Sequence, residues 1–153
     1  MNCPKIFNKK SAGFTLIELL VVIGILAVLL SIVLIAINPA RQFSQANDTK
    51  RKSDIGSILN AVGAFAADNK GTLPAGITEA PLPISKAGAN ICADLVTTYI
   101  SALPTDPKTA AGASVIDCTS DYNTGYTIEK DASNRVKVSA PAGEIDQSIS
   151  ITR

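Results

Sequence analysis

The longest apolar stretch of the chain lies near its beginning and spans residues 14–37. One charged residue, Glu18, and three further residues, Thr15, Gly24 and Ser31, are its only interruptions. As a helix with about 1.5 Å rise per residue, the stretch would be about 36 Å long, which exceeds the roughly 30 Å hydrocarbon core of a bilayer. The pattern therefore predicts a transmembrane helix.

A positively charged segment precedes this run and predicts its orientation. Residues 1–13 contain Lys5, Lys9 and Lys10 but no acidic residue. Because lysines beside a span resist translocation, we expect the N-terminus in the cytoplasm and residues 38–153 outside it. A removable secretory signal peptide would have an apolar region of about 7–15 residues and a small-x-small cleavage site, and this run is longer and ends without one. An uncleaved anchor that carries an unrelated extracytoplasmic module remains open on hydropathy alone.

An amphipathic pattern follows the apolar run. Pro39 removes one helix hydrogen bond, so a kink or local melting is expected within residues 35–39. Residues 40–69 then carry apolar side chains at spacings of three and four, which predicts a helix with one stripe packed on a globular head. The stripe comprises Phe43, Ile55, Ile58, Leu59, Val62, Phe65 and Ala66. Four charged residues of this helix are expected to remain solvated, namely Lys50, Arg51, Lys52 and Asp54.

Residues 71–153 have the short apolar segments of a small mixed domain. Gly71 predicts the end of the amphipathic helix. Residues 72–89 are rich in proline, alanine and glycine and are expected to form a loop. Residues 91–100 are expected to form a short helix that Asn90 caps.

Strands are predicted closer to the C-terminus. Apolar and polar residues alternate in residues 126–130 and 135–139, which predicts a hairpin around residues 131–134, and residues 148–152 add a further strand. These segments give a small antiparallel sheet. The expected fold class is α+β, with the amphipathic half of the spine, residues 38–70, packed on the sheet.

Composition argues against catalysis. The chain has no histidine, which excludes a Ser-His-Asp relay, an imidazole general base and an imidazole metal ligand. It also has no G-x-S-x-G, S-x-x-K, H-E-x-x-H or phosphate-loop motif, so we expect no enzyme activity.

Charge does not indicate a nucleic-acid partner. Three of the 14 basic residues lie in residues 1–13, so 11 basic and 13 acidic residues lie beyond Gly13. The one basic cluster, Lys50 to Lys52, is offset by Asp48 and Asp54, and nucleic-acid binding is therefore not expected.

The junction between the cationic segment and the apolar run carries the most specific signal. Residues 9–19 read Lys-Lys-Ser-Ala-Gly-Phe-Thr-Leu-Ile-Glu-Leu. This stretch resembles the processing site of the type IV prepilin family, which includes the pseudopilins of type II secretion. The resemblance implies that a prepilin peptidase removes residues 1–13 by cutting between Gly13 and Phe14, and that the new Phe14 amine is N-methylated. Glycine suits the cut because it resists helix formation and leaves the backbone unobstructed.

The same resemblance implies a structural role with the lollipop fold of pilins. The chain would lie in the cytoplasmic membrane until an assembly ATPase and a platform protein draw it into a helical homo-oligomeric filament. That filament would be a surface pilus or a periplasmic pseudopilus. The Glu18 carboxylate would attract the Phe14 amine of a neighbouring subunit and set its register. A carboxylate near the centre of a membrane helix costs about 2.5–3.5 kcal/mol, so Glu18 is expected to have such a partner.

Two features of the head add to this picture. Residues 103–107 read Leu-Pro-Thr-Asp-Pro and resemble a turn of many pilins and pseudopilins, although Lys108 stands where the secretion form usually has tryptophan. Cys3 lies in the expected leader, so Cys92 and Cys118 remain for a disulfide in an exported domain. Two buried free thiols are the alternative.

Calcium is the one cofactor for which the sequence offers ligands. Asp106, Asp117, Asp121 and Asn123 carry hard oxygens, and a corresponding loop binds calcium in major pseudopilins. Their spacing follows no calcium-loop signature, and Asp and Asn are also common in turns. We therefore expect no cofactor from the spacing itself.

Overall fold

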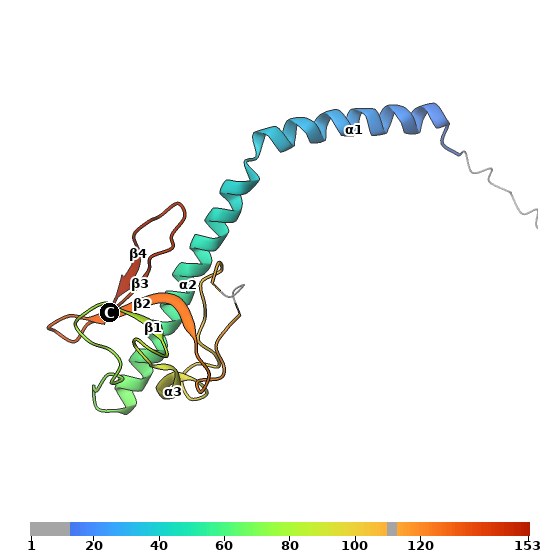
Figure 1. Ribbon diagram of the computed structural model, residues 1–153. Helices are drawn as coiled ribbons and strands as arrows, with labels where there is room; N and C mark the ends of the chain where they lie inside the picture. Colours follow the sequence, from blue (N-terminus) through green and yellow to red (C-terminus); the bar gives the residue numbers. More distant parts are fainter. Residues whose placement is uncertain (1–12, 110–112) are drawn as a thin grey trace, which may run out of the picture. The chain divides into compact units, whose positions relative to one another are not determined.

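The structure, a computed structural model, describes residues 13–109 and 113–153. The chain divides into two compact units, Met1–Pro39 and Ala40–Arg153. Helix α1 (Leu16–Ala36) belongs to the first unit, and helix α2 (Pro39–Asp68) belongs to the second from its second residue onward (Figure 1). The second unit also holds a short helix, α3, and a four-stranded antiparallel sheet, so the α+β fold class is confirmed. The expected leader lies outside the described residues except for Gly13.

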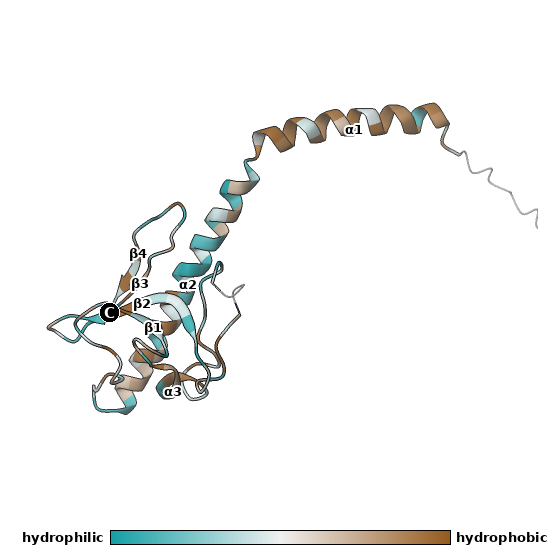
Figure 2. Ribbon diagram, viewed as in Figure 1, coloured by the Kyte–Doolittle hydropathy of each residue, from teal (hydrophilic) through white to brown (hydrophobic). Residues whose placement is uncertain are grey.

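Helix α1 is apolar over nearly its whole length, as Figure 2 shows. Within the described part of the chain it is the one helix that is long and apolar enough to cross a membrane. The residues of its Leu16–Ile35 segment are exposed. Length and composition thus agree with the predicted span.

A short non-helical link separates the two helices. Ile37 is extended, with φ −94° and ψ 116°, and donates its N–H to the Val33 carbonyl at 3.0 Å. Helix α2 then begins at Pro39, where the missing N–H costs no helix hydrogen bond. The predicted interruption is therefore confirmed as the end of one helix and the start of another.

The apolar stripe of α2 supplies one side of the core of the head. Ile55, Ile58, Leu59 and Val62 are buried in a single cluster with residues of the sheet, as predicted. The expectation that Phe43 joins this stripe is wrong, because its side chain is 72% exposed. The first turns of α2 contact a polar loop instead of the apolar core.

The sheet has strand order β1-β2-β3-β4, and every neighbouring pair is antiparallel. Buried residues alternate with partly exposed residues along β2 and β3. The predicted hairpin is confirmed, with Ile128 paired to Val138, and so is the last strand. The strands are β1 (Leu82–Ser85), β2 (Asn123–Lys130), β3 (Val136–Ala140) and β4 (Ile149–Thr152).

Strand β1 was not predicted, because it lies in the segment expected to be a loop. It has four residues and contains Pro83, and a proline in a sequence argues against a strand. Its place at the edge of the sheet explains why proline is tolerated, since one side of an edge strand needs no donor.

Helix α3 comprises Cys92–Leu95 and is shorter than the predicted helix of residues 91–100. The chain leaves the helix at Val96 and turns at Thr97, which has a φ of 74°. The β-branched run that follows Leu95 disfavours further helix. The expectation that Asn90 caps this helix is also wrong, because Asn90 Oδ1 accepts the Tyr122 hydroxyl at 2.9 Å instead.

Candidate functional site

Two residues organise the start of α1. The Thr15 Oγ1 accepts the Glu18 N–H at 3.2 Å, and Glu18 Oε2 accepts the Thr15 N–H at 2.9 Å and the Thr15 hydroxyl at 2.8 Å. This reciprocal arrangement is a capping box, and it places the carboxylate at the N-terminal end of the helix dipole. The cap was not predicted, although a Thr followed three residues later by a Glu ahead of an apolar run is its sequence pattern.

The expected cleavage junction lies directly before this cap. Gly13 and Phe14 are non-helical and exposed, and the Phe14 side chain is 86% exposed. Among the described residues, no heavy atom comes within 4 Å of the place that a Cβ on Gly13 would occupy. A protease that approached this bond would meet an accessible backbone, and the capped helix would begin two residues into the product.

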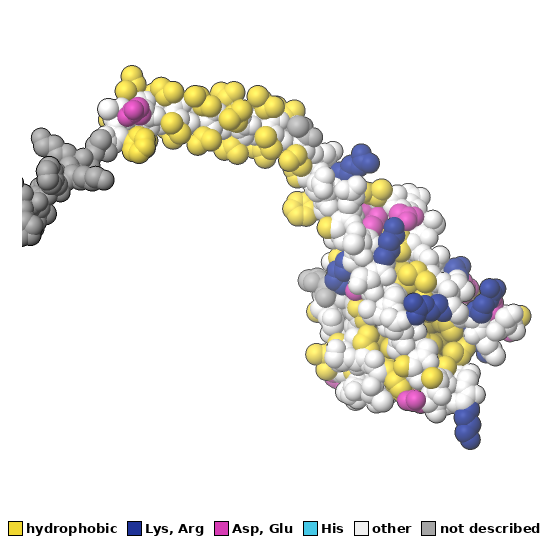
Figure 3. Space-filling view, turned by 180° about the vertical axis from the view of Figure 1, so that it is seen from behind, with side chains coloured by type: hydrophobic (Ala, Val, Ile, Leu, Met, Phe, Trp, Pro, Cys, Tyr) yellow, Lys and Arg dark blue, Asp and Glu magenta, His cyan; other side chains and the backbone are white. Residues whose placement is uncertain are grey.

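The surface of α1 is the second part of the candidate site. Its large apolar side chains are between 49% exposed, at Val33, and 87% exposed, at Ile35. Figure 3 shows this surface as a continuous apolar covering with one acidic group near the start of the helix. Ser31 adds no outward donor, since its hydroxyl bonds to the Ala27 carbonyl at 2.8 Å. Such a surface requires either lipid or other apolar helices around it.

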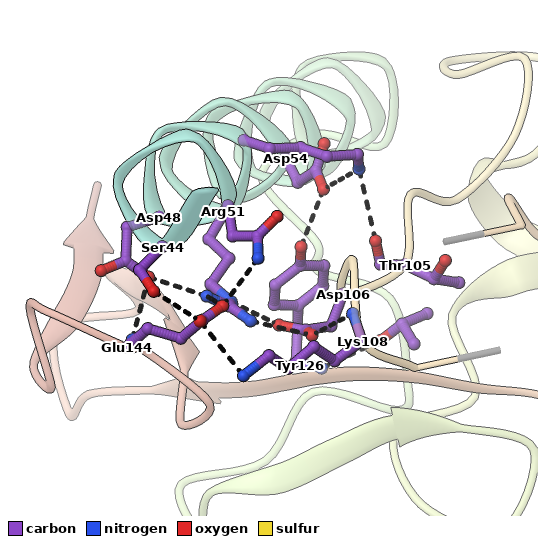
Figure 4. A network of polar contacts seen from close by, with 12 residues as sticks. Ser44, Asp48, Arg51, Asp54, Thr105, Asp106, Lys108, Tyr126 and Glu144 are labelled. Atoms are coloured by element: carbon purple, nitrogen blue, oxygen red, sulfur yellow. Dashed lines mark hydrogen bonds and ion pairs between the residues drawn. The ribbon is translucent and has the colours of Figure 1, made fainter. Parts of the chain in front are cut away.

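A cluster of charged residues lies inside the head, around Arg51 of α2 (Figure 4). The guanidinium donates from Nε and Nη2 to the two oxygens of Asp106, at 2.6 and 3.1 Å. Its Nη1 donates to Asp48 at 2.7 Å and to Glu144 at 3.1 Å. One arginine thereby holds three carboxylates, which come from α2, from the Leu-Pro-Thr-Asp-Pro turn and from the loop after β3.

The expectation that Arg51 and Asp54 stay solvated is wrong, since Arg51 is fully buried and Asp54 is 9% exposed. Arg51 lies four residues before Ile55 and seven before Ile58, so it shares the face of the helix that packs on the head. That spacing was the signal in the sequence. Lys52 is exposed as predicted, and its ammonium lies 3.2 Å from Asp146.

Asp48 is held by the backbone of the loop after β3. Its two oxygens accept the N–H groups of Glu144, Ile145 and Asp146 at 2.8–3.1 Å. Burial by itself would raise the pKa of Asp48, but these three bonds and the Arg51 guanidinium hold the pKa well below its ordinary value.

Two further carboxyls of the cluster are also kept ionised. Hydrogen bonds from Asn47 and contact with Lys108 lower the pKa of Glu144 to about 2. Burial would raise the pKa of Asp106, but the bidentate contact with Arg51 lowers it below the ordinary value. The cluster is therefore an ionised network at neutral pH.

Beside this network, Asp54 joins α2 to the sheet. It accepts the hydroxyl of Tyr126, a fully buried residue of β2, at 2.7 Å and the Lys50 ammonium at 2.5 Å. Burial, and then the neighbouring Asp54, raise the pKa of Tyr126 far above its ordinary value, so the hydroxyl stays protonated and donates. In the described part of the chain every buried side-chain nitrogen and oxygen has a hydrogen-bond partner. The network thus fastens segments together and leaves no buried group unpaired for proton transfer.

The structure joins Cys92 of α3 to Cys118 in a disulfide, with Cα atoms 5.5 Å apart. This bond closes a loop that contains the Asp106 turn. The disulfide and the contact between Arg51 and Asp106 therefore both restrain the same segment. Cys92 is buried, and Cys118 packs against the edge of the core.

Three of the four residues considered for calcium, Asp106, Asp117 and Asn123, are engaged separately. Asp106 is occupied by Arg51, and Asp117 accepts hydrogen bonds from Thr119 and Ser120 of its own turn. Asn123 accepts the Gly125 N–H at 3.0 Å. Within residues 13–109 and 113–153, no three acidic, cysteine or histidine side chains gather in a way that would hold a metal ion.

Comparison with known families places the most specific feature at the start of the chain. Residues 8–34 match the family model described as the prokaryotic N-terminal methylation motif. This motif is the leader signature of type IV pilin and pseudopilin precursors, and it covers both the Gly13–Phe14 junction and nearly all of α1. The comparisons with curated proteins and with solved structures gave no match.

Proposed function

We propose that the chain is the precursor of a structural subunit of a type IV pilus-like filament. In this proposal a prepilin peptidase cuts between Gly13 and Phe14 and the new Phe14 amine is N-methylated. The mature subunit waits in the cytoplasmic membrane on α1 until an assembly ATPase and a platform protein transfer it to the fibre. The head, residues 71–153, stays on the extracytoplasmic side together with α2.

The observation that carries the proposal is the match of residues 8–34 to the methylation motif. Removal of the leader at Gly13 would retain α1, whereas secretory processing would discard the apolar segment. A retained helix whose large apolar side chains are exposed fits a subunit that moves from lipid into a bundle of identical helices. Van der Waals contact between such helices would replace contact with lipid.

Glu18 has a defined place in this proposal. In the single chain its carboxylate contacts Thr15, at the same end of the helix where cleavage would create the Phe14 ammonium. A neighbouring ammonium would bring a full positive charge to a carboxylate that otherwise lies in an apolar surface. A subunit at the wrong axial offset would leave both charges unpaired, which gives the pair its power to select register.

The methylation motif is common to pilins and pseudopilins, so the choice between them rests on the head. Lys108 replaces the tryptophan that usually follows the turn in the secretion form, and its ammonium contacts Glu144 at 3.1 Å. On this feature we favour a pilus subunit over a pseudopilin. A signal-anchored module without assembly is the alternative from another class.

Assembly of Glu18 variants tests the proposal. Glu18→Ala and Glu18→Leu should insert in the membrane and be processed like the parent, but the yield of filaments sheared from cells should fall at least tenfold. The matched control is Ser31→Ala, which also replaces a polar residue of α1 and should assemble normally, because the Ser31 hydroxyl bonds only within its own helix. Normal filament yield from either Glu18 variant would refute the proposed register role.

A further inference from the structure

The first part of α2 differs from the rest of the helix in what holds it. Residues 40–50 bury no apolar side chain, and the one large apolar residue among them, Phe43, is 72% exposed. The first turn of α2 also has no acidic residue to offset the helix dipole. A helical segment of this length is marginal in water without outside contacts. Polar contacts must therefore keep residues 40–50 in place.

Most of those contacts come from one loop. Residues 141–148 connect β3 to β4, and Glu144 in this loop accepts the Ser44 hydroxyl at 2.9 Å and the Asn47 amide at 2.8 Å. Asp48 receives the three consecutive backbone N–H groups of the same loop. Glycine is required at position 143 of the loop, since a Cβ there would collide with the Asp146 carbonyl oxygen.

We propose that residues 141–148 form a strap that opens as a unit and thereby releases residues 40–50 of α2 while the apolar core of the head stays folded. The strap consists of hydrogen bonds and ion pairs, whereas the core from Ile55 onward consists of buried apolar side chains. The two parts thus depend on different interactions. Regions held by few apolar contacts open at lower free energy than the core of the same protein.

Arg51 forms the boundary between the part that opens and the part that stays. It contacts the strap through Glu144 at 3.1 Å and the fixed turn through both oxygens of Asp106. When the strap opens, the bidentate pair with Asp106 keeps the guanidinium on the head. The disulfide between Cys92 and Cys118 holds the segment of that turn in place. Opening should therefore stop at Arg51.

Hydrogen exchange followed by mass spectrometry tests the strap on the purified full-length chain in detergent micelles. Glu144→Ala removes the acceptor for Ser44, Asn47 and Arg51. We expect exchange in peptides covering residues 40–50 to accelerate at least tenfold, with residues 55–62 changing less than twofold. The matched control is Glu129→Ala, which removes a pair with Lys137 at 2.9 Å on the sheet and should leave residues 40–50 unchanged.

Two results would overturn the strap. Unchanged exchange in residues 40–50 would mean that the loop does not hold them, and equal acceleration in residues 55–62 would mean that strap and core open together. If Glu144→Ala fails to fold, the double variant Ser44→Ala and Asn47→Ala replaces it, because each change removes one hydrogen bond and leaves the carboxylates in place. That variant should accelerate exchange in residues 40–50 about threefold, confined to this segment, and any other pattern would again refute the strap.

Discussion

Arg51 shows how one side chain can connect segments that are far apart in sequence. Its guanidinium has five donors in a fixed plane, and four hydrogen bonds from three of its nitrogens reach Asp48, Asp106 and Glu144. Because the arginine is fully buried, the guanidinium and the carboxylates have lost hydrogen bonds to water. Each of these bonds replaces part of that lost hydration. The arrangement makes the head sensitive to loss of the positive charge.

Replacement of Arg51 by methionine should therefore destabilise the head strongly. Arg51→Met keeps an apolar stem but leaves Asp48, Asp106 and Glu144 close together without the guanidinium between them, and removal of one partner from such a buried pair costs about 3–5 kcal/mol. Lys52→Met is the matched control one residue away, and at an exposed site it should change the free energy of unfolding by less than about 0.5 kcal/mol. Urea denaturation followed by circular dichroism in detergent measures both. Equal values for the two variants would contradict the account of the network.

Acid should weaken the same network. The pKa of Glu144 is about 2 in the folded head against an ordinary value of 4.5, and the pKa values of Asp48 and Asp106 are also lowered. A carboxyl with a lowered folded-state pKa contributes fully above its unfolded-state pKa, and the contribution is lost as the pH falls through the folded-state value. The melting temperature should thus fall between about pH 4.5 and pH 2. Glu144→Gln should show a shallower fall, and an identical pH profile would exclude Glu144 as a contributor.

At the scale of elements, the glycines of the head have different roles. Gly63 lies within α2, and no atom comes within 4 Å of an added Cβ, whereas Gly125 in β2 has a φ of 80° and an added Cβ would lie 2.8 Å from Thr109 Oγ1. Gly63→Ala should stabilise the head by about 0.5–1 kcal/mol, because alanine loses less backbone entropy in a helix. Gly125→Ala should destabilise it by more than that, because this position of β2 needs the left-handed conformation. Thermal melts of the two variants that shift in the same direction would contradict this assignment.

The elements also show how far the sequence predicts this fold. Long periodic segments, such as the apolar run and the stripe at Ile55 to Val62, predict α1 and α2 because many residues in each segment follow one pattern. Strand β1 and the end of α3 were not predicted, because each depends on a single residue. Pro83 is tolerated because its strand lies at the edge of the sheet, and Thr97 turns the chain after the helix through its backbone conformation. Burial of Arg51 follows from helix spacing, but two of its three partners lie 55 and 93 residues away and no local pattern reveals them. For the candidate site, the expected cleavage junction, Glu18 and the Thr15–Glu18 pattern of the capping box lie in the sequence. The contacts of residues 141–148 with α2 join residues 96 to 100 positions apart, and no local pattern reveals them.

At the scale of the whole molecule, the two units have different requirements. The head is held by an apolar core, a disulfide and a buried ionic network within one chain. The large apolar side chains of helix α1 are exposed, and such a surface needs lipid or other helices around it. This contrast agrees with a subunit that is anchored first and assembled later, and it makes retention of α1 after processing the central point of the account.

The most direct test of that point is the intact mass and N-terminal residue of the protein recovered from membranes and from filaments sheared off cells. The account predicts a chain in the sheared fraction that starts at N-methylated Phe14 and keeps the disulfide between Cys92 and Cys118. Control cells without prepilin peptidase should hold only the chain that starts at Met1, in the membrane. A chain that starts at Met1 and stays in the membrane of peptidase-positive cells would contradict the account and indicate a signal-anchored module.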